Sequence, residues 1–311
     1  MDRNPFHEGE LYVQERAGER GIAARVGAGV GDVIPSRGVP FLAEQRLLVV
    51  GSVDAEGAPS ASVLFGDRGF VTAVTERAVA VDRTRVHVIG EDPLWRNLRV
   101  GADVGLLAID LGSRLRLRIN GVVMSVVDER IDVAVREAYG NCPKYIQRRH
   151  FTLDAAGEAV DREAAVSGSE LDPARTRLIE AADTLFVASR HPRRGVDVSH
   201  RGGEPGFVRL VAPDQLRVPD YRGNSMFNTL GNLVVGERAG LSFLDFEGAR
   251  LLQLVGPVRV QFDESEDPRQ PTGGTGRYWY VDVERWLELP LGPRSTWELL
   301  DRSPHNPIAQ V

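Results

Sequence analysis

Val100–Val123 reads VGADVGLLAIDLGSRLRLRINGVV and aligns without a gap with Val235–Val258, which reads VGERAGLSFLDFEGARLLQLVGPV. The matched positions include Gly101, Gly105, Leu106, Asp110 and Gly121, which meet Gly236, Gly240, Leu241, Asp245 and Gly256. A second pair of stretches, Phe41–Val71 and Leu178–Val208, precedes this pair in the same order, and both end in Gly-Phe-Val. Two matched blocks in one order indicate two copies of one domain.

Each copy alternates apolar and polar residues over lengths typical of strands. In Arg114–Asn120, RLRLRIN, the residues Leu115, Leu117 and Ile119 would face one side and the arginines the other. Glycine-rich turns recur about every 8–12 residues, which is typical of an antiparallel sheet or a small barrel. The pattern therefore predicts a mainly β (α+β) protein with few helices.

The domain organisation follows from the repeat. Residues 1–38 are predicted to form an N-terminal arm and residues 39–127 the first barrel. Residues 128–172 are predicted to be a helical connection, because DERIDVAVREAYG offers Asp128 as N-cap and Gly140 as terminator, and a polar, Ala- and Gly-rich stretch follows. Asp172-Pro173 would start the helix that leads into the second barrel, residues 173–311, which carries a C-terminal extension.

Composition narrows the classes of function. The chain has 311 residues, 42% hydrophobic and 26% charged, and a formal net charge of −6, which gives nucleic acid and anionic membranes no general attraction. Cys142 is the only cysteine, so neither an intrachain disulfide nor a cysteine metal cluster is expected. The six histidines show no metal-ligand spacing. Without an apolar signal core or spanning segment, we expect a soluble, cytoplasmic protein.

The stretch YRGNSMFNTLGN, residues 221–232, is the strongest candidate for a binding segment. Gly223-Asn224 predicts a turn, and the following residues predict a short helix with Asn224 as N-cap and Gly231 as terminator. The start of a helix offers unpaired backbone N–H groups to a phosphate, and Arg222 and Ser225 would add donors. The alternative is a capped helix that binds nothing. The corresponding GEDPLWRNLR of the first copy is less polar, which favours a function retained in the second copy.

Three other regions carry candidate residues. His200, Arg201 and Arg209 lie in VSHRGGEPGFVRL, where the first copy has Val63 and Leu64 opposite His200 and Arg201. Gln253 could hydrogen-bond a planar heterocycle or be a solvated strand residue. YGNCPKYIQRRH, residues 139–150, holds Cys142 and the only lysine, Lys144. We interpret it as a structured loop packed on the barrel, because no Cys/His/Asn spacing supports a nucleophile.

These motifs together resemble the pyridoxamine 5'-phosphate oxidase-like family of flavin-nucleotide-binding proteins. The resemblance rests on FLAEQRLLVVGSVDAEGAPSASVL, DYRGNSMFNTLGN and RLLQLVGPVRVQF, while HEGE near the start and YGNCPKYIQRRH are similar to a long subgroup. It implies two tandem split β-barrels that form an intrachain pseudo-dimer, with FMN at their interface. The residues that it implies for cofactor binding are Arg201, Arg209, Arg222, Asn224, Ser225, Asn228 and Gln253.

The function that this resemblance implies is that of an FMN-dependent oxidoreductase acting on a small-molecule substrate or electron donor. His200 is the candidate for proton transfer, because an imidazole titrates near pH 7. The alternative is a non-catalytic flavin- or haem-binding split-barrel module. Asn224-Ser225-Met226 replaces the Ser-Arg-Lys of the vitamin-biosynthetic oxidase, so oxidation of pyridoxamine phosphate itself is not expected. No nucleic-acid or membrane partner is expected, and association into a homodimer is left open.

Overall fold

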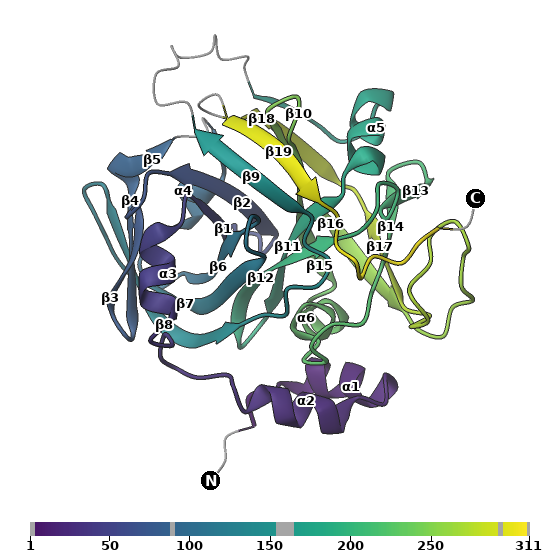
Figure 1. Cartoon of the computed structure of the whole chain (residues 1–311), viewed down its shortest axis with the longest axis horizontal. Helices are drawn as coiled ribbons and strands as arrows, with labels where there is room; N and C mark the ends of the chain where they lie inside the picture. The colour runs from purple at the N-terminus through teal and green to yellow at the C-terminus, as the bar shows by residue number, and fades with distance from the viewer. Residues whose placement is uncertain (1–3, 88–90, 154–164, 292–294, 310–311) are drawn as a thin grey trace.

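The structure is a computed structural model that describes residues 4–87, 91–153, 165–291 and 295–309. Two β-rich halves lie side by side, the first drawn in purple to blue and the second in green to yellow (Figure 1). Helices α1 and α2 lie below the barrels in this view, with α1 against α6. Within the described ranges, no helix is both long and apolar enough to cross a bilayer.

The first half is built on one antiparallel sheet with the strand order β3-β4-β8-β7-β6-β1-β2-β5. Its strands are β1 (Leu47–Val53), β2 (Pro59–Gly66), β3 (Val71–Thr75), β4 (Ala78–Asp82), β5 (Val86–His87), β6 (Asp103–Asp110), β7 (Leu115–Val127) and β8 (Arg130–Gly140). The long β7 pairs with both β6 and β8. Every one of these pairings is antiparallel, as the alternating pattern predicts.

The second half is built on the strand order β12-β11-β15-β16-β17-β14-β13, with β18 on β16 and β10 on β18. Its strands are β10 (Val166–Gly168), β11 (Thr184–His191), β12 (Gly195–Gly202), β13 (Arg209–Ala212), β14 (Gln215–Pro219), β15 (Arg238–Asp245), β16 (Arg250–Gln261), β17 (Tyr278–Asp282) and β18 (Arg285–Pro290). The order β2-β1-β6-β7-β8-β4-β3 of the first half matches it strand for strand.

Equivalent side chains make equivalent contacts in the two halves. Asn97 Nδ2 donates to Ser52 Oγ at 2.9 Å, and Asn232 Nδ2 donates to Ser189 Oγ at 3.0 Å. Both asparagines lie at the same distance from the start of the matched stretches quoted above. The predicted duplication is therefore confirmed, and the chain forms two tandem split β-barrels that pack as an intrachain pseudo-dimer.

Six short α-helices and one 3-10 turn accompany the strands within the described residues. They are α1 (Glu8–Arg16), α2 (Arg20–Gly27), α3 (Gly38–Glu44), η1 (Arg83–Arg85), α4 (Leu94–Asn97), α5 (Pro173–Ala181) and α6 (Asn228–Gly236). The Asp172 carboxylate accepts hydrogen bonds from the backbone N–H groups of Ala174 and Arg175 at 3.0 and 2.9 Å. The predicted helix start at Asp172-Pro173 is confirmed.

The predicted helical connection over residues 128–172 is wrong. Arg130–Gly140 forms strand β8, in which Ile131, Val133 and Val135 face the core at alternate positions and are each at most 9% exposed. This strand pairs with β4 and β7 and occupies the place that β17 takes in the second barrel. Further along, β9 (Arg148–Leu153) pairs with β19 (Ser295–Asp301). Residues 154–164, inside the predicted boundary between the domains, lie outside the described residues.

The central strands are buried on both faces because the two barrels pack against each other. In β1, Leu48 and Val50 point into the core of the first barrel, while Leu47 and Val49 point into a separate core between the barrels. The second barrel has a core of its own. The core between the barrels also includes Val63, Leu107, Ile109, Phe186, Ala188, Val198, Leu244 and Leu251.

Glycine lets the two backbones approach closely at two equivalent places. A Cβ on Gly240 in β15 would lie 2.3 Å from the carbonyl oxygen of Pro59 in β2. A Cβ on Gly105 in β6 would lie 3.0 Å from Asp197 Cα and from Val198 N in β12. These are backbone atoms, so no side-chain rotation can relieve the overlap. The matched glycines of the repeat thus fix the distance between the barrels.

We expect Gly240→Ala to destabilise the protein by about 1–3 kcal/mol, because the added methyl group overlaps a rigid strand. The free energy of unfolding in urea measures the loss. Gly105→Ala should cost less, since its contacts are longer. Gly223→Ala is the control, because nothing lies within 4 Å of its Cβ position. A Gly240→Ala variant as stable as this control would contradict the close approach.

Helix α1 rests on α6 and buries an acidic side chain between them. Glu10 is 4% exposed and accepts hydrogen bonds from the His7 backbone N–H at 2.8 Å and from the Asn228 amide. Burial raises the pKa of Glu10 to about 7 against these two hydrogen bonds, and the nearby Asp197 and Glu137 raise it further. The carboxyl therefore binds its proton more tightly in the folded protein than in the unfolded chain.

This shift predicts a pH dependence of stability. Between about pH 4.5 and 7 the folded protein keeps the Glu10 proton that the unfolded chain loses. The stabilisation of the folded state by this proton is therefore fully present below pH 4.5 and is lost as the pH rises through 7. Glu10→Gln should reduce the fall in unfolding free energy between pH 4.5 and 8 by about 3 kcal/mol. Urea unfolding of both proteins at the two pH values measures it, and parallel profiles would contradict the raised pKa.

Candidate functional site

A pocket lies at the interface of the two barrels and is called the interface pocket below. Its first-barrel wall consists of Arg116 and Arg118 on β7 and of the loop residues Asn141, Cys142, Lys144 and Tyr145. Its second-barrel wall consists of Ser199, His200 and Arg201 on β12 and of residues around Asn224, Ser225 and Asn228. The cavity volume is about 80 Å³. Neither barrel alone contains the site.

Arg116 lines this pocket and forms no ion pair with an acidic side chain of the described residues, unlike Arg118 and Arg201. Its guanidinium donates twice to the backbone oxygen of Cys142, with Nε at 2.9 Å, and more distantly to that of His200 at 3.5 Å. Burial lowers the pKa of Arg116 to about 9, and the charges of Arg118 and Arg201 lower it in the same direction. A site that holds these like charges together favours an anion.

Arg118, in contrast, forms an ion pair and hydrogen bonds through its terminal nitrogens, while its Nε makes no hydrogen bond to the described residues. Its guanidinium donates to Asp197 Oδ2 at 2.7 Å and to Ser199 Oγ at 2.6 Å, both on β12. Both members of the ion pair have side chains that are 5% exposed. Burial acts to lower the pKa of Arg118, but Asp197 outweighs it and holds the pKa above its ordinary value. The pair joins β7 to β12 across the interface.

His200 lies in the pocket as a neutral imidazole. It is 5% exposed, and its Nε2 has no hydrogen-bond partner among the described residues. Burial holds the pKa of His200 well below its ordinary value, and the charges of Arg116 and Arg201 act in the same direction. The prediction that this imidazole titrates near pH 7 is therefore wrong. It can accept or donate one hydrogen bond, but it holds no extra proton to release.

The predicted phosphate segment lines the pocket, although most of its side-chain donors point elsewhere. Ser225 Oγ donates to Glu19 at 2.5 Å, and the Asn228 amide donates to Glu10. Asn224 Nδ2 donates to Asn141 Oδ1 at 3.2 Å, which ties the two walls together. Of these three residues, Asn224 alone directs its donor across the pocket.

The helix in this segment begins later than predicted. Helix α6 starts at Asn228, after Phe227 in the left-handed conformation with φ 62°, so Asn224 is not its N-cap. Gly231 lies inside α6, which runs to Gly236, and not at its end. A Cβ at Gly231 would lie 2.6 Å from Glu10 N. The glycine makes room for α1 and does not terminate α6.

Three predicted cofactor residues do not line the pocket. Arg209 starts β13 and lies opposite Arg217 in the β13–β14 register. Arg222 has an exposed side chain, and only its backbone oxygen takes part, by accepting the Tyr145 hydroxyl at 2.9 Å. Gln253 lies at the other side of the interface, where its amide donates to Asp92 Oδ2 at 2.9 Å. The structure brings together His200, Arg201, Asn224, Ser225 and Asn228.

The sequence reasoning missed the wall that the first barrel contributes. Arg116 and Arg118 belong to the alternating stretch RLRLRIN, whose arginine face is predicted to point away from the core. That face meets the second barrel instead. Lys144 and Tyr145 follow the only cysteine in a loop that sequence reasoning assigned to packing alone. In a pseudo-dimer, both copies contribute residues to each site at the interface. Applied to the sequence, this rule could have identified Arg116, Arg118, Lys144 and Tyr145 as candidates.

The duplication also produces a second cleft, with different chemistry. At the positions equivalent to Arg116 and Arg118 the second barrel has Leu251 and Gln253. Gln253 lines a cleft of about 850 Å³ together with residues of the first barrel such as Asn97. A leucine and a glutamine thus replace the two arginines, although Arg96, Arg99 and Arg285 also line this cleft.

Several donors in the interface pocket remain unused. Within the described part of the chain, Arg201 Nε, Asn141 Nδ2, His200 Nε2 and Arg118 Nε are buried and make no hydrogen bond. Buried polar groups are normally hydrogen-bonded, so a group of unused ones at a single pocket needs a partner. With Arg116 beside them, the complementary partner is an anion with several acceptor oxygens.

Comparisons with known proteins concern the fold. No protein-family model and no curated protein matches the chain. The solved structure of HupZ from Group A Streptococcus is 14% identical and covers 43% of this chain and 98% of its own, with a TM-score of 0.31. A proposed pyridoxamine 5'-phosphate oxidase from Lactobacillus delbrueckii is 14% identical, and the match covers 35% of this chain and 95% of that protein, with a TM-score of 0.28.

A protein related to general stress protein 26 of B. subtilis, of the pyridoxinephosphate oxidase family, comes from Clostridium acetobutylicum. It is 15% identical and covers 40% of this chain and 84% of its own, with a TM-score of 0.22. Each of these three structures spans less than half of this chain. The pairing of two barrels rests on the matching strand orders described above.

We expect Arg118→Met to lower the free energy of unfolding by about 3–5 kcal/mol, because it leaves the Asp197 carboxylate buried without its cation. Arg116→Met is the matched comparison on the same strand, and it should cost only about 1 kcal/mol, because that guanidinium bonds carbonyl oxygens alone. Urea unfolding at pH 7 measures both. Equal losses would contradict the division between a structural and an unpaired arginine.

Proposed function

We propose that the chain is a flavin-nucleotide-binding protein that holds the phosphate of FMN in the interface pocket. The observation that carries this proposal is the set of buried, unused donors around an arginine without an acidic partner. A phosphate dianion offers acceptor oxygens and charge to both kinds of group. The resemblance of the sequence to flavin-nucleotide-binding split barrels agrees with this chemistry.

The size of the pocket decides which part of the cofactor it would hold. A water molecule needs about 10–15 Å³ in this measure, so about 80 Å³ accepts a phosphate group and excludes a tricyclic ring. The ring would have to lie outside this volume. Tyr145 and Tyr221, whose ring centroids are 4.9 Å apart, also line the pocket and offer aromatic surface there.

The residues of the chain would bind and orient the cofactor and neutralise the charge of its phosphate. Arg116 and Arg201, one from each wall, would offset the charge of the phosphate, and Asn141 would offer an amide donor from the first-barrel wall. His200 supplies one neutral hydrogen bond. When bound, the flavin supplies the electron transfer, so no strongly acidic or basic side chain is required. We therefore propose an oxidoreductase acting on a small molecule, in which the flavin carries the redox chemistry.

Absorbance spectroscopy of the purified protein tests the proposal. Protein reconstituted with FMN and freed of excess cofactor should keep a flavin absorbance near 450 nm and lose it on addition of a reduced nicotinamide or another electron donor. Cofactor that is retained but reduced by no donor would overturn the oxidoreductase and leave a flavin-binding module. Protein that retains no FMN would overturn the flavin assignment.

We expect Asn224→Asp to weaken FMN binding about tenfold, or about 1.4 kcal/mol, because it places a negative charge at the pocket wall. It also removes the donor that Asn224 directs to Asn141. Titration of the flavin fluorescence measures the affinity. Gln261→Glu is the control, because it adds the same charge at an exposed position of β16. Unchanged affinity in Asn224→Asp would place the phosphate elsewhere.

A further inference from the structure

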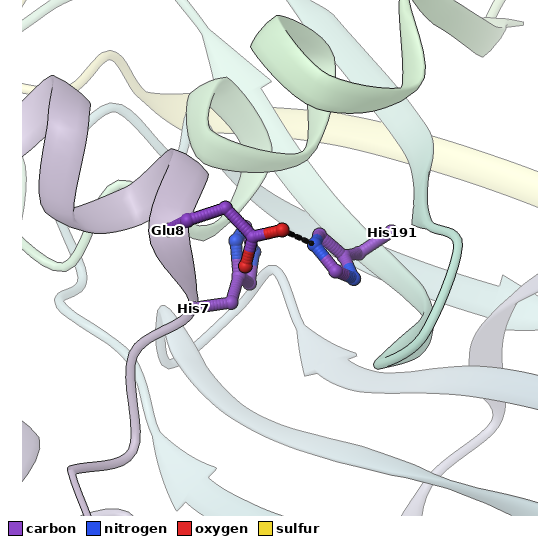
Figure 2. A group of neighbouring side chains, drawn as sticks. All are labelled: His7, Glu8 and His191. Atoms are coloured by element: carbon purple, nitrogen blue, oxygen red, sulfur yellow. Dashed lines mark ion pairs between the residues drawn. The ribbon is translucent and has the colours of Figure 1, made fainter.

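The HEGE sequence near the start of the chain, residues 7–10, fastens the N-terminal arm to the second barrel. His7 is the N-cap of α1, and its Nε2 lies 3.0 Å from Asn232 Oδ1 on α6. Glu8 Oε1 lies 3.3 Å from His191 Nε2 at the end of β11, and Figure 2 shows the two side chains pointing toward each other. All of these contacts join the arm to one barrel.

His7, Glu8 and His191 bring two imidazoles and a carboxylate within 4.8 Å of one another, a set that zinc uses in other proteins. Their hydrogen bonds assign them another role. His7 Nδ1 accepts the Gly9 backbone N–H at 3.1 Å, and His191 Nδ1 accepts that of Arg193 at 3.1 Å. Each ring therefore carries its proton on Nε2, the atom that faces Asn232 or Glu8. The group is a docking contact.

Gly9 and Glu10 complete this contact. A Cβ on Gly9 would lie 2.2 Å from the backbone oxygen of Gly231, so α1 and α6 cross at a pair of glycines. The close crossing places Glu10 directly over the first turn of α6. Its carboxylate accepts the amide N–H of Asn228, the first residue of that helix.

Beyond this crossing the arm holds the pocket wall at further places. Gln14 Nε2 donates to the backbone oxygen of Met226 at 3.1 Å, and Gln14 is 1% exposed. Glu19, between α1 and α2, accepts the hydroxyl of Ser225 at 2.5 Å. Glu10, Gln14 and Glu19 thus bind Asn228, Met226 and Ser225 in sequence along the segment that lines the interface pocket.

That segment needs external support. Ser225 and Phe227 have φ angles of 64° and 62°, in the left-handed region that side-chain-bearing residues rarely adopt. Such residues persist only where their surroundings hold them. Asn224, the neighbour of Ser225, makes the contact across the pocket to Asn141. The position of this wall therefore depends on the contacts behind it, and the arm supplies them.

We propose that the N-terminal arm is a working part of the interface pocket, with Glu10 and Glu19 as positioning residues that hold the wall at residues 224–228 in its ligand-binding form. This inference rests on the proposed function only for the identity of the ligand. The hydrogen bonds from the arm also turn Ser225 and Asn228 away from the pocket and leave the cations to face it.

Cys142 is the only cysteine of the chain and lines the pocket beside Asn141, so its alkylation reports on the wall without any ligand. Iodoacetamide should modify the Glu10→Ala/Glu19→Gln variant at least about fivefold faster than the parent, because the loss of a hydrogen bond raises the population of an opened segment by about that factor. Glu15→Gln is the control, since Glu15 lies on α1 and its carboxylate pairs with the exposed Arg20. Equal rates in all three proteins would overturn the proposal.

Affinity for FMN gives a second readout that separates positioning from charge. Removing a carboxylate from behind the wall would by electrostatics alone tighten the binding of an anion. A positioning role predicts the opposite, and the single variant Glu19→Gln should bind FMN about fivefold more weakly while its melting temperature stays near that of the parent. Tighter binding would overturn the positioning role.

The two proposals fail in different ways. If the parent protein binds no FMN, the flavin assignment fails and the alkylation rates still decide the role of the arm. If FMN binds and Cys142 reacts equally in every variant, the flavin assignment stands and the arm has no part in the pocket. Glu10→Gln keeps one acceptor oxygen for the Asn228 amide. A variant that carries Glu10→Gln instead of Glu10→Ala should therefore be alkylated at Cys142 more slowly than the Glu10→Ala variant.

Discussion

The close approach of the two barrels at Gly105 and Gly240 is the constraint on which the rest of the structure depends. Because backbone meets backbone there, the outer face of each central strand becomes an inner face of the dimer-like interface, and a third core fills it. The same approach brings β7 against β12, so that Arg118 reaches Asp197 and Ser199. The interface pocket forms beside this ion pair.

Duplication gives two related clefts, and the side chains make them different. Arg118 bonds Ser199, and its counterpart Gln253 lies near the equivalent Ser62 at 3.4 Å. Each of these two side chains donates to a buried acid, Arg118 to Asp197 on β12 and Gln253 to Asp92. A glutamine needs no counter-ion. One pocket has a volume of about 80 Å³ and is lined by Arg116 and Arg118, whereas the other has a volume of about 850 Å³ and has Leu251 and Gln253 at the equivalent positions.

The sequence predicted the duplication, the antiparallel sheets and the helix start at Asp172, because each depends on local residues or on direct comparison of the two copies. Strand β8 was missed because Ile131, Val135 and Ala138 also fit a helical spacing, although Val133 is buried too. Comparison with the second copy could have corrected this error. β8 corresponds to β17, whose sequence YWYVD alternates in the same way.

The candidate site was only half predictable for a physical reason. Periodicity shows that Arg116 and Arg118 point away from the core of their own barrel, but it does not show that a second barrel covers them. Likewise Asn224, Ser225 and Asn228 form a donor-rich segment in the sequence, while Glu10 and Glu19, more than 200 residues away, decide where two of those donors point. Such long-range partners leave no local signal.

The like charges at the pocket are a cost that the fold carries without a ligand. Burial and the neighbouring arginines lower the pKa of Arg116 to about 9, which means that its charged form is less favourable there than in water. Asp197 and Asp220 offset Arg118 and Arg201, and neither is bonded to Arg116. An anion bound beside Arg116 relieves this repulsion and satisfies the unused donors, so part of its affinity comes from strain already present in the protein.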